Sequence, residues 1–289
     1  MSADTATQSR LRSRRRRASA SQSGVILALS VLAGVGLFPY LFMLLSSFKT
    51  NEQFYQNFWG LSLPLEFGNY AVAWQQVNPY LTTSLIVAAA STIGTIALGA
   101  TSAYVLARYR FLGRNVLFAF VAVLMMIPNI ASIIPLFVLV RDLGILNTYW
   151  VLIIPQVASG LVLAIILMKT FFEGVPQELF DAAKIDGASG PRLFRSILLP
   201  LSSPIIGTVA LMTVISVWND FFWPLLTISD DSLRTVPVGL SFFQGQNATE
   251  WGPLFAGYAI SSIPLLLLFV FLSKWFLAGL QGGIAGVAK

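Results

Sequence analysis

Long apolar runs divide the chain, and they constrain its fold more than any other feature. A helix needs ~20 predominantly apolar residues to cross a bilayer. Runs of about that length lie at Gly24–Ser46, Leu81–Ala107, Val116–Val140, Trp150–Phe171, Ser203–Leu225 and Leu254–Ala278. Hydrophobic residues make up 56% of the chain and charged residues only 10%. The runs lack the alternation of a membrane β-strand. The sequence therefore predicts an all-α membrane protein with six transmembrane helices.

Lys and Arg are distributed unevenly between the two sides that six spans would create. Cytoplasmic loops carry an excess of these residues. If the N-terminus is cytoplasmic, only Lys49, Arg141 and Arg234 lie outside. The bias predicts that both termini are cytoplasmic. A short turn containing Gly144 and Asn147 would join the third span to the fourth.

The segments around the spans differ in composition. Residues 1–23 are rich in Ser, Ala, Thr and Arg, which predicts a disordered basic cytoplasmic arm at the membrane surface. Membrane lipid is favoured over nucleic acid as the partner of this arm. The first transmembrane helix and an extracytoplasmic loop would occupy residues 24–79, a transmembrane core residues 80–274, and a cytoplasmic tail residues 275–289.

Several kinds of chemistry are excluded by residues that the sequence lacks. The chain has no Cys and no His, which excludes thiol nucleophiles, disulfides and His-based metal sites or general bases. It also has no phosphate-binding loop of the G-x-x-x-x-G-K-[ST] type. We therefore expect no cofactor, no metal and no ATPase activity in this chain. A membrane-embedded enzyme would have little chemistry to work with.

The segment Asp181–Pro200 is a charged block between the fourth and fifth apolar runs. Pro176 suits the first turn of a helix, where its missing N–H needs no partner. Gly187 suits the left-handed residue that ends a helix. A second helix would begin around Pro191 and end before Pro200. One face of it would carry the apolar residues Leu193, Phe194, Ile197 and Leu198. The block is therefore predicted to form two helices joined by a glycine turn, on the cytoplasmic side.

The spacing in this block resembles the EAA loop of binding-protein-dependent ABC importer permeases, which have a MetI-like transmembrane domain. Asp181-Ala182-Ala183, Gly187, Ile197 and Leu199-Pro200 stand at the spacing of that loop, with Asp181 in place of the usual Glu. The resemblance implies that the block docks on a separate ATPase. The docking residues would be Asp181, Ala182, Ala183, Gly187, Phe194 and Pro200. Asp181 would face a basic residue, the two alanines would allow close approach, and Gly187 would permit the turn.

Further segments resemble the sugar-importer branch of these permeases, and in particular a chain like the smaller membrane subunit of the maltose system. They are Ser84–Thr92, Ala103–Phe111, Met126–Pro128, Trp218–Leu225 and Ala278–Gly283. The resemblance implies a type I importer permease in a bacterial-type cell membrane, which is a translocation subunit and not an enzyme. Its implied partners are a dimer of ATP-binding subunits, a second and related permease in a heterodimer, an extracytoplasmic solute-binding protein, and a sugar or oligosaccharide. Loops Lys49–Tyr80 and Ile228–Pro253 could contact the binding protein.

Trp218, Asn219 and Asp220 form the candidate substrate path. Aromatic rings with amide and carboxylate groups suit a carbohydrate. An aromatic belt at the lipid interface also explains Trp and Phe residues here, and we favour the belt for the aromatic residues. Two other functions remain as alternatives: an importer permease for a non-sugar solute such as glycerol phosphate, and an ion-coupled secondary transporter. The centres of the spans are nearly free of charge, which argues against the second.

Overall fold

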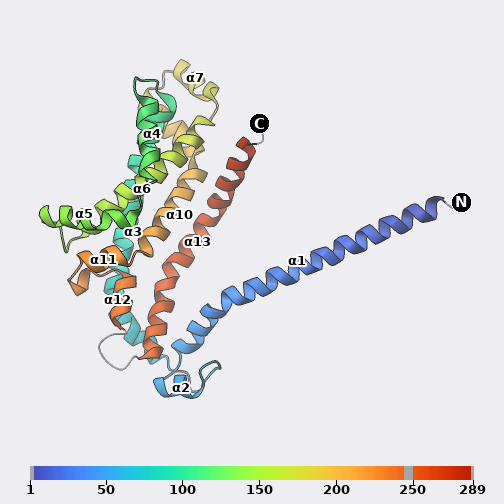
Figure 1. Cartoon of the computed structure of the whole chain (residues 1–289), viewed down its shortest axis with the longest axis vertical. Coiled ribbons are helices and arrows are strands. Elements are labelled where there is room, and N and C mark those ends of the chain that lie inside the picture. Colours follow the sequence, from blue (N-terminus) through green and yellow to red (C-terminus); the bar gives the residue numbers. More distant parts are fainter. Residues whose placement is uncertain (1–2, 244–249, 288–289) are drawn as a thin grey trace. The chain divides into compact units, whose positions relative to one another are not determined.

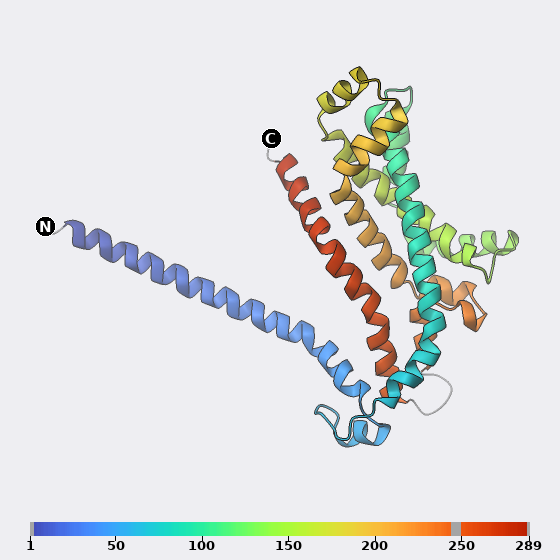
Figure 2. The same cartoon turned by 180° about the vertical axis from the view of Figure 1, so that it is seen from behind.

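The computed structural model describes residues 3–243 and 250–287, and every regular element within these residues is a helix (Figures 1 and 2). The chain separates into two compact units. The first unit comprises Met1–Tyr70 and Glu250–Ala259, and the second comprises Ala71–Thr249 and Ile260–Lys289. Two long helices, α3 (Gly68–Arg108) and α13 (Trp251–Val287), contribute residues to both units.

The first unit contains helix α1 (Ala3–Ser47) and helix α2 (Asn51–Gln56). Helix α1 extends back to Ala3, into the segment predicted to be a disordered arm. Ala, Arg and Gln are good helix formers, so these residues can continue the helix of the adjoining span. From Gly24 to Leu41 the apolar side chains of α1 are exposed, as expected of a helix that faces lipid. Similarly, α13 continues as a helix through most of the predicted tail, up to Val287.

The segment after α1 is folded. Thr50 and Gln53 form a reciprocal capping box at the start of α2, which satisfies two of its free N–H groups. The ring of Phe54 stacks on Trp251 at 5.1 Å. The Lys49 side chain is buried, and its Nζ donates to the backbone oxygens of Asn57 (2.7 Å) and Phe58 (3.0 Å). Burial lowers the pKa of Lys49.

The second unit is built around the packing of α3 against α6 (Tyr149–Glu173). A Cβ added at Gly99 would lie 3.0 Å from the Cβ of Ala164, and one added at Gly160 would lie 3.0 Å from Oγ1 of Thr95. Small residues therefore allow the two backbones to approach closely, as is common between membrane helices. The connection before α6 has positive φ at Gly144 (69°) and Asn147 (58°), which confirms the predicted turn.

Two of the predicted spans are broken. Helices Gly24–Ser47, Gly68–Arg108, Tyr149–Glu173 and Trp251–Phe271 are each long and apolar enough to cross a membrane. By contrast, α4 (Arg114–Leu124) and α5 (Asn129–Asp142) are bent by 98° to each other (Figure 1). Pro128 causes this break because it lacks an N–H and disfavours helix at the preceding residue. The prediction of one continuous helix over Val116–Val140 is therefore wrong.

The predicted fifth span is also interrupted. Helix α10 (Ser203–Trp218) ends where the prediction continued to Leu225, and a separate short helix, α11 (Phe222–Thr227), follows. At its other end α10 is bent by 76° from the helical run Gly190–Leu201. Counting each bent pair as one span or as none, the described residues provide four to six candidate spans.

Two apolar clusters form the core of the second unit. One cluster joins α3, α6, α10 and α12 (Val236–Phe243) and includes Val77, Val151, Val217 and Leu240. The other joins α3 and α6 to the segment that follows α6, and includes Ala103, Phe172, Phe180 and Leu198. The second cluster holds the charged block against the ends of the long helices.

Candidate docking segment and translocation cavity

Helix α7 (Gln177–Ile185) begins directly after Pro176 and ends in a Schellman turn. Gly187 has φ +79°, a conformation that L side chains rarely adopt. The N–H of Gly187 donates to the carbonyl of Lys184, and that of Ala188 donates to the carbonyl of Ala183, both at 2.9 Å. This is the hydrogen-bond pattern of the motif, and it confirms the predicted glycine turn.

The second half of the block is a continuous helical run, composed of α8 (Gly190–Leu193), a π-helical turn η1 (Phe194–Leu198) and α9 (Leu199–Leu201). The expectation that this helix ends before Pro200 is wrong, because Pro200 lies inside α9. Proline cannot donate to the carbonyl four residues earlier, and its ring clashes with that carbonyl. The wider π turn just before Pro200 accommodates both effects.

One face of the docking segment, as we call the residues from α7 to α9 (177–201), is buried and the other is exposed. Leu193 and Leu198 of the predicted apolar stripe lie in the core, whereas its other two members, Phe194 and Ile197, are half-buried. Phe180 of α7 is also buried. Asp181 and Ala182 are exposed, and Ala183 is half-buried. The other proposed docking residues differ in position. Gly187 and Pro200 are exposed, whereas Phe194 is half-buried and its ring lies 5.1 Å from that of Tyr104.

The carboxylate of Asp181 is held in place by residues of its own helix. Gln177 Nε2 donates to its Oδ1 at 3.0 Å, and Lys184 Nζ donates to the same oxygen at 3.2 Å. The hydrogen bond from Gln177, followed by that from Lys184, lowers the pKa of Asp181. The side chain remains more than half exposed. It therefore presents a stable negative charge beside the small side chain of Ala182.

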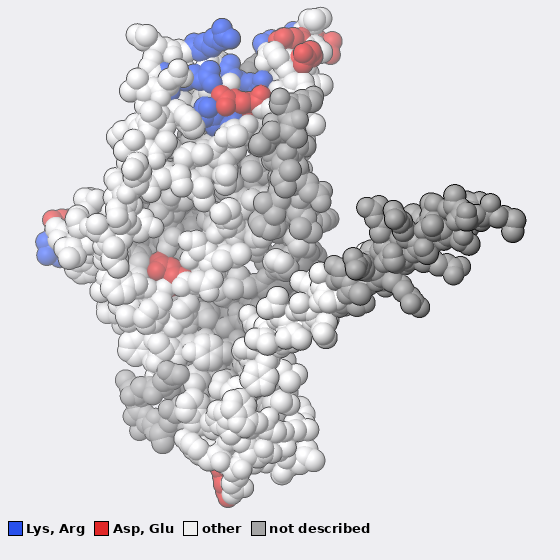
Figure 3. Space-filling model, turned by 45° about the vertical axis from the view of Figure 1, so that its right-hand side comes forward, with Lys and Arg blue, Asp and Glu red and all other residues white. Residues whose placement is uncertain are grey.

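Basic side chains gather at the end of the second unit that carries α7, with acidic side chains among them (Figure 3). Lys169 and Arg114 both pair with Glu173, at 2.9 and 2.8 Å. This joins the first turn of α4 to the last turn of α6. Arg108, the last residue of α3, contacts the start of α7. Sequence reasoning did not identify Arg108 as a site residue, although the Ala103–Phe111 segment that contains it stood out by resemblance.

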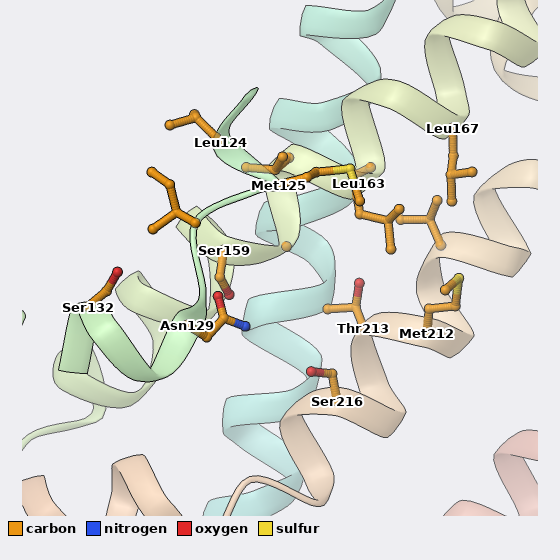
Figure 4. Close-up of a pocket in the computed structure, with 15 residues that line it drawn as sticks. Leu124, Met125, Asn129, Ser132, Ser159, Leu163, Leu167, Met212, Thr213 and Ser216 are labelled. Carbon is orange, nitrogen blue, oxygen red and sulfur yellow. The ribbon is translucent and has the colours of Figure 1, made fainter. Parts of the chain in front are cut away.

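A cavity of about 560 Å³ lies between the α4–α5 break, α6 and α10. Its polar lining consists of Asn129, Ser132, Ser159, Thr213 and Ser216, and none of the fifteen residues that line it is charged. In Figure 4, Leu124, Met125, Leu163 and Leu167 lie towards one end, and Asn129, Ser159, Thr213 and Ser216 lie towards the other. Broken backbone at membrane depth is tolerated where it lines a cavity or is buried in protein, and here it lines one.

Residues 95–282 match the family described as "Binding-protein-dependent transport system inner membrane component". This chain belongs to that family. It is 35% identical over 248 residues to the probable ABC transporter permease protein YurM of Bacillus subtilis (85% of this chain, 82% of the relative). It is 34% identical over 269 residues to the trehalose/maltose transport system permease protein MalG of Thermococcus litoralis (90% and 95%). The match confirms the resemblance drawn from the block Asp181–Pro200.

The fold is also similar to that of a bacterial ABC transporter chain of known structure, from a transporter involved in the import of the acidic polysaccharide alginate. The TM-score is 0.74 at 21% identity, covering 89% of this chain and 98% of that chain. This similarity concerns the fold. Together with the family match and the candidate spans, it shows a multi-pass, all-helical inner membrane component with the permease fold.

In this transport component, the sequence-predicted path residues do not line the cavity. Trp218 is buried in the core, and so is Trp223, whose Nε1 donates to the carbonyl of Val151 at 2.8 Å. An aromatic belt facing lipid therefore does not explain these two tryptophans. Asn219 is exposed and donates to the carbonyl of Ile215.

The carboxylate of Asp220 is hydrogen-bonded to other residues and does not line the cavity. It accepts a hydrogen bond from Gln156 Nε2 of α6, and another from the backbone N–H of Trp223 at 3.4 Å. Its carboxylate thus ties α6 to the start of α11. The cavity residues Thr213 and Ser216 lie on α10, shortly before Trp218. Their small hydroxyls carry no signal that distinguishes them in the sequence from residues that pack helices.

The part of the chain that the structure describes contains no cluster of metal-ligating side chains. No group of three or more Asp, Glu, Cys or His side chains there could hold an ion. The chemistry available at the cavity is hydrogen bonding from hydroxyl and amide groups, combined with apolar contact.

Proposed function

We propose that this protein is one of two permease subunits of an ATP-driven importer, and that it translocates a sugar or oligosaccharide across the cell membrane. The observation that carries the proposal is the docking segment. An exposed helix with a stable carboxylate at Asp181 ends in a left-handed turn at Gly187, in a chain without a phosphate-binding loop. Such a chain needs a separate ATPase to supply energy.

The proposed arrangement has six spans, with each bent helix pair counted as one, and both termini in the cytoplasm. The uneven distribution of Lys and Arg supports this orientation. In this orientation α7 would lie on the side where ATP is available. Asp181, Ala182 and Gly187 would contact the ATPase directly, while Ala183, Phe194 and Pro200 would hold the segment in shape. The chain itself would perform no covalent chemistry.

The complete importer would contain a dimer of ATP-binding subunits, a second and related permease, and an extracytoplasmic solute-binding protein. ATP-driven closure of the ATPase dimer would displace the docking segment and open the path outward to the docked binding protein. Hydrolysis would then return the path to its inward-facing state.

The lining of the 560 Å³ cavity supports a neutral, polyhydroxylated substrate. Hydroxyl and amide groups with apolar walls suit the hydroxyls and CH faces of a sugar. An anionic solute such as glycerol phosphate would call for a cationic partner, and no charged residue lines this cavity. The names of several relatives agree, since they are permeases for trehalose/maltose, arabinooligosaccharides, and melibiose/raffinose/stachyose.

The test is reconstitution. An affinity-tagged chain would be purified from its own membranes with the proteins that bind it, and the complex would be placed in proteoliposomes. Uptake of radiolabelled maltose, trehalose and raffinose would be measured with internal ATP and the binding protein, and with an ion gradient alone. We expect uptake only with ATP and the binding protein. Uptake driven by an ion gradient without an ATPase would refute the proposal.

A further inference from the structure

The guanidinium of Arg108 joins three parts of the fold. Its Nη2 donates to the backbone oxygens of Phe172, in the last turn of α6, and of Val175 (2.6 Å) in the connection to α7. Its Nη1 donates to Oε1 of Gln177, the first residue of α7, at 3.1 Å. Its central carbon lies 4.2 Å from the centre of the Phe180 ring. One side chain from the end of α3 therefore contacts the end of α6 and the beginning of α7.

Each of these contacts suits arginine in particular. The carbonyls at the end of a helix have no partner within the helix and carry partial negative charge, so a cation beside α6 is favoured there. The planar fork of arginine can serve several acceptors at once and stack on an aromatic ring. Lysine would keep the charge but would lose the fork. Phe180 is almost fully buried, so the ring against which Arg108 stacks is fixed.

A chain of hydrogen bonds leads from Arg108 to the docking carboxylate. Gln177 accepts from Arg108 through Oε1 and donates to Asp181 through Nε2 at 3.0 Å. Asp181 is the residue proposed to meet a basic residue of the ATPase. If an ATPase residue becomes a new partner of Asp181, the hydrogen bond from Gln177 to Asp181 is affected, and Gln177 is hydrogen-bonded directly to Arg108.

The other end of the connection reaches the cavity. Helix α6, whose last turn is bonded to Arg108, supplies the cavity residues Ser159 and Leu163. Helix α3, which carries Arg108, packs closely against the same part of α6 at Gly160. A displacement of α7 that is passed to the ends of α3 and α6 would thus move one wall of the cavity.

We propose that Arg108 is a positioning residue that couples the docking segment to α3 and α6, so that movement of the segment reaches the cavity. The inference rests on the proposed function, because coupling has a meaning only in an ATP-driven importer. It differs from a purely structural role. A structural arginine would support assembly, whereas a coupling arginine sets how much uptake each hydrolysed ATP produces.

The first experiment compares Arg108→Gln, Arg108→Lys and the matched control Arg110→Gln, at an exposed arginine two residues further along. Each is tested in the complete complex in proteoliposomes, with ATP hydrolysis and uptake of radiolabelled maltose, trehalose or raffinose, whichever the wild type takes up, measured together. For Arg108→Gln we expect the ATPase to co-purify with the permease in the normal amount and to keep hydrolysing ATP. Uptake per hydrolysed ATP should be lower by about ten-fold, within the range seen for residues between coupled sites. Uptake per ATP in Arg108→Lys should lie between the values for the wild type and Arg108→Gln, and in Arg110→Gln it should match the wild type. Normal uptake per ATP in Arg108→Gln would overturn the proposal.

A second measurement does not depend on transport. The chain contains no Cys, so spin labels can be attached to cysteines placed at Thr101 on α3 and Glu178 on α7, both of which are exposed. In nanodiscs containing the full chain, the distance distribution between the labels should be narrow in the wild type and broader in Arg108→Gln. Equal widths would overturn the proposal. This result stands even if the substrate is not a sugar, so the two proposals can fail separately.

Discussion

Substitution of Gly187 by Ala isolates the backbone conformation of the docking turn. At φ +79° a Cβ meets no atom within 4 Å, so steric clash with neighbours contributes nothing. The cost is that of placing an L residue in the left-handed region, roughly 1–2 kcal/mol. If that energy opposes the turn, the ratio of correctly formed to unformed α7 ends falls by about 5- to 30-fold. Apparent affinity for the ATPase falls with the fraction of formed turn, by up to the same factor.

The assay is a binding titration of the purified ATPase onto the permease in nanodiscs. Gly187→Asn should lose less than Gly187→Ala, because Asn tolerates the left-handed region. Gly144→Ala is the matched control, since Gly144 also has positive φ (69°) and open space around its Cβ position, but lies between α5 and α6. It should leave ATPase affinity unchanged. Equal affinity for Gly187→Ala and wild type, or an equal loss in the Gly144→Ala control, would refute the reasoning.

Three further predictions concern single side chains. Asp181→Lys should abolish ATPase binding, and Asp181→Glu should keep it. Hydrogen bonds from Gln177 and then Lys184 lower the pKa of Asp181 from its usual 3.8, so its charge is lost only at still lower pH. ATPase binding should therefore be constant from pH 5.5 to 8. A pH dependence of binding with a midpoint above 5 would contradict this. Thr213→Val should reduce uptake about 2- to 10-fold through one lost hydrogen bond, with stimulation of the ATPase by the binding protein unchanged; undiminished uptake would exclude this hydroxyl from the path. Trp223→Phe leaves the buried carbonyl of Val151 without its donor and should lower the free energy of unfolding by about 1–3 kcal/mol, seen as a lower melting temperature in detergent. An unchanged melting temperature would show that this hydrogen bond adds no stability.

Features set by local chemistry could be predicted from the sequence. The turn at Gly187 and the turn containing Gly144 and Asn147 both depend on residues that tolerate positive φ, and the structure has all three in that region. The buried stripe of the docking segment follows from apolar spacing alone. The family could also be recognised, because its motif is a spacing of specific residues around Asp181.

Features set by packing between distant segments could not be predicted. Hydropathy does not distinguish a tryptophan that faces lipid from one in the core, and Trp218 and Trp223 are both buried. A proline within an apolar run can kink a helix or break it, and Pro128 precedes α5, which is bent by 98° from α4. The cavity is lined by ordinary Ser, Thr and Asn side chains, whose common position appears only when α5, α6 and α10 are brought together.

Helix α6 connects the proposed docking segment with the cavity. Its C-terminal turn places Phe172 in the apolar cluster beside the docking segment, and its middle places Ser159 and Gly160 at the cavity. Because Gly160 lets α6 lie against α3 without a gap, the two helices form a close-packed pair, and such packing transmits displacement instead of absorbing it. A looser pair would allow the docking segment to move while the cavity stayed still. In the proposed coupling the close contact would be required, and Arg108 stands at the end of the pair where a push from an ATPase would arrive.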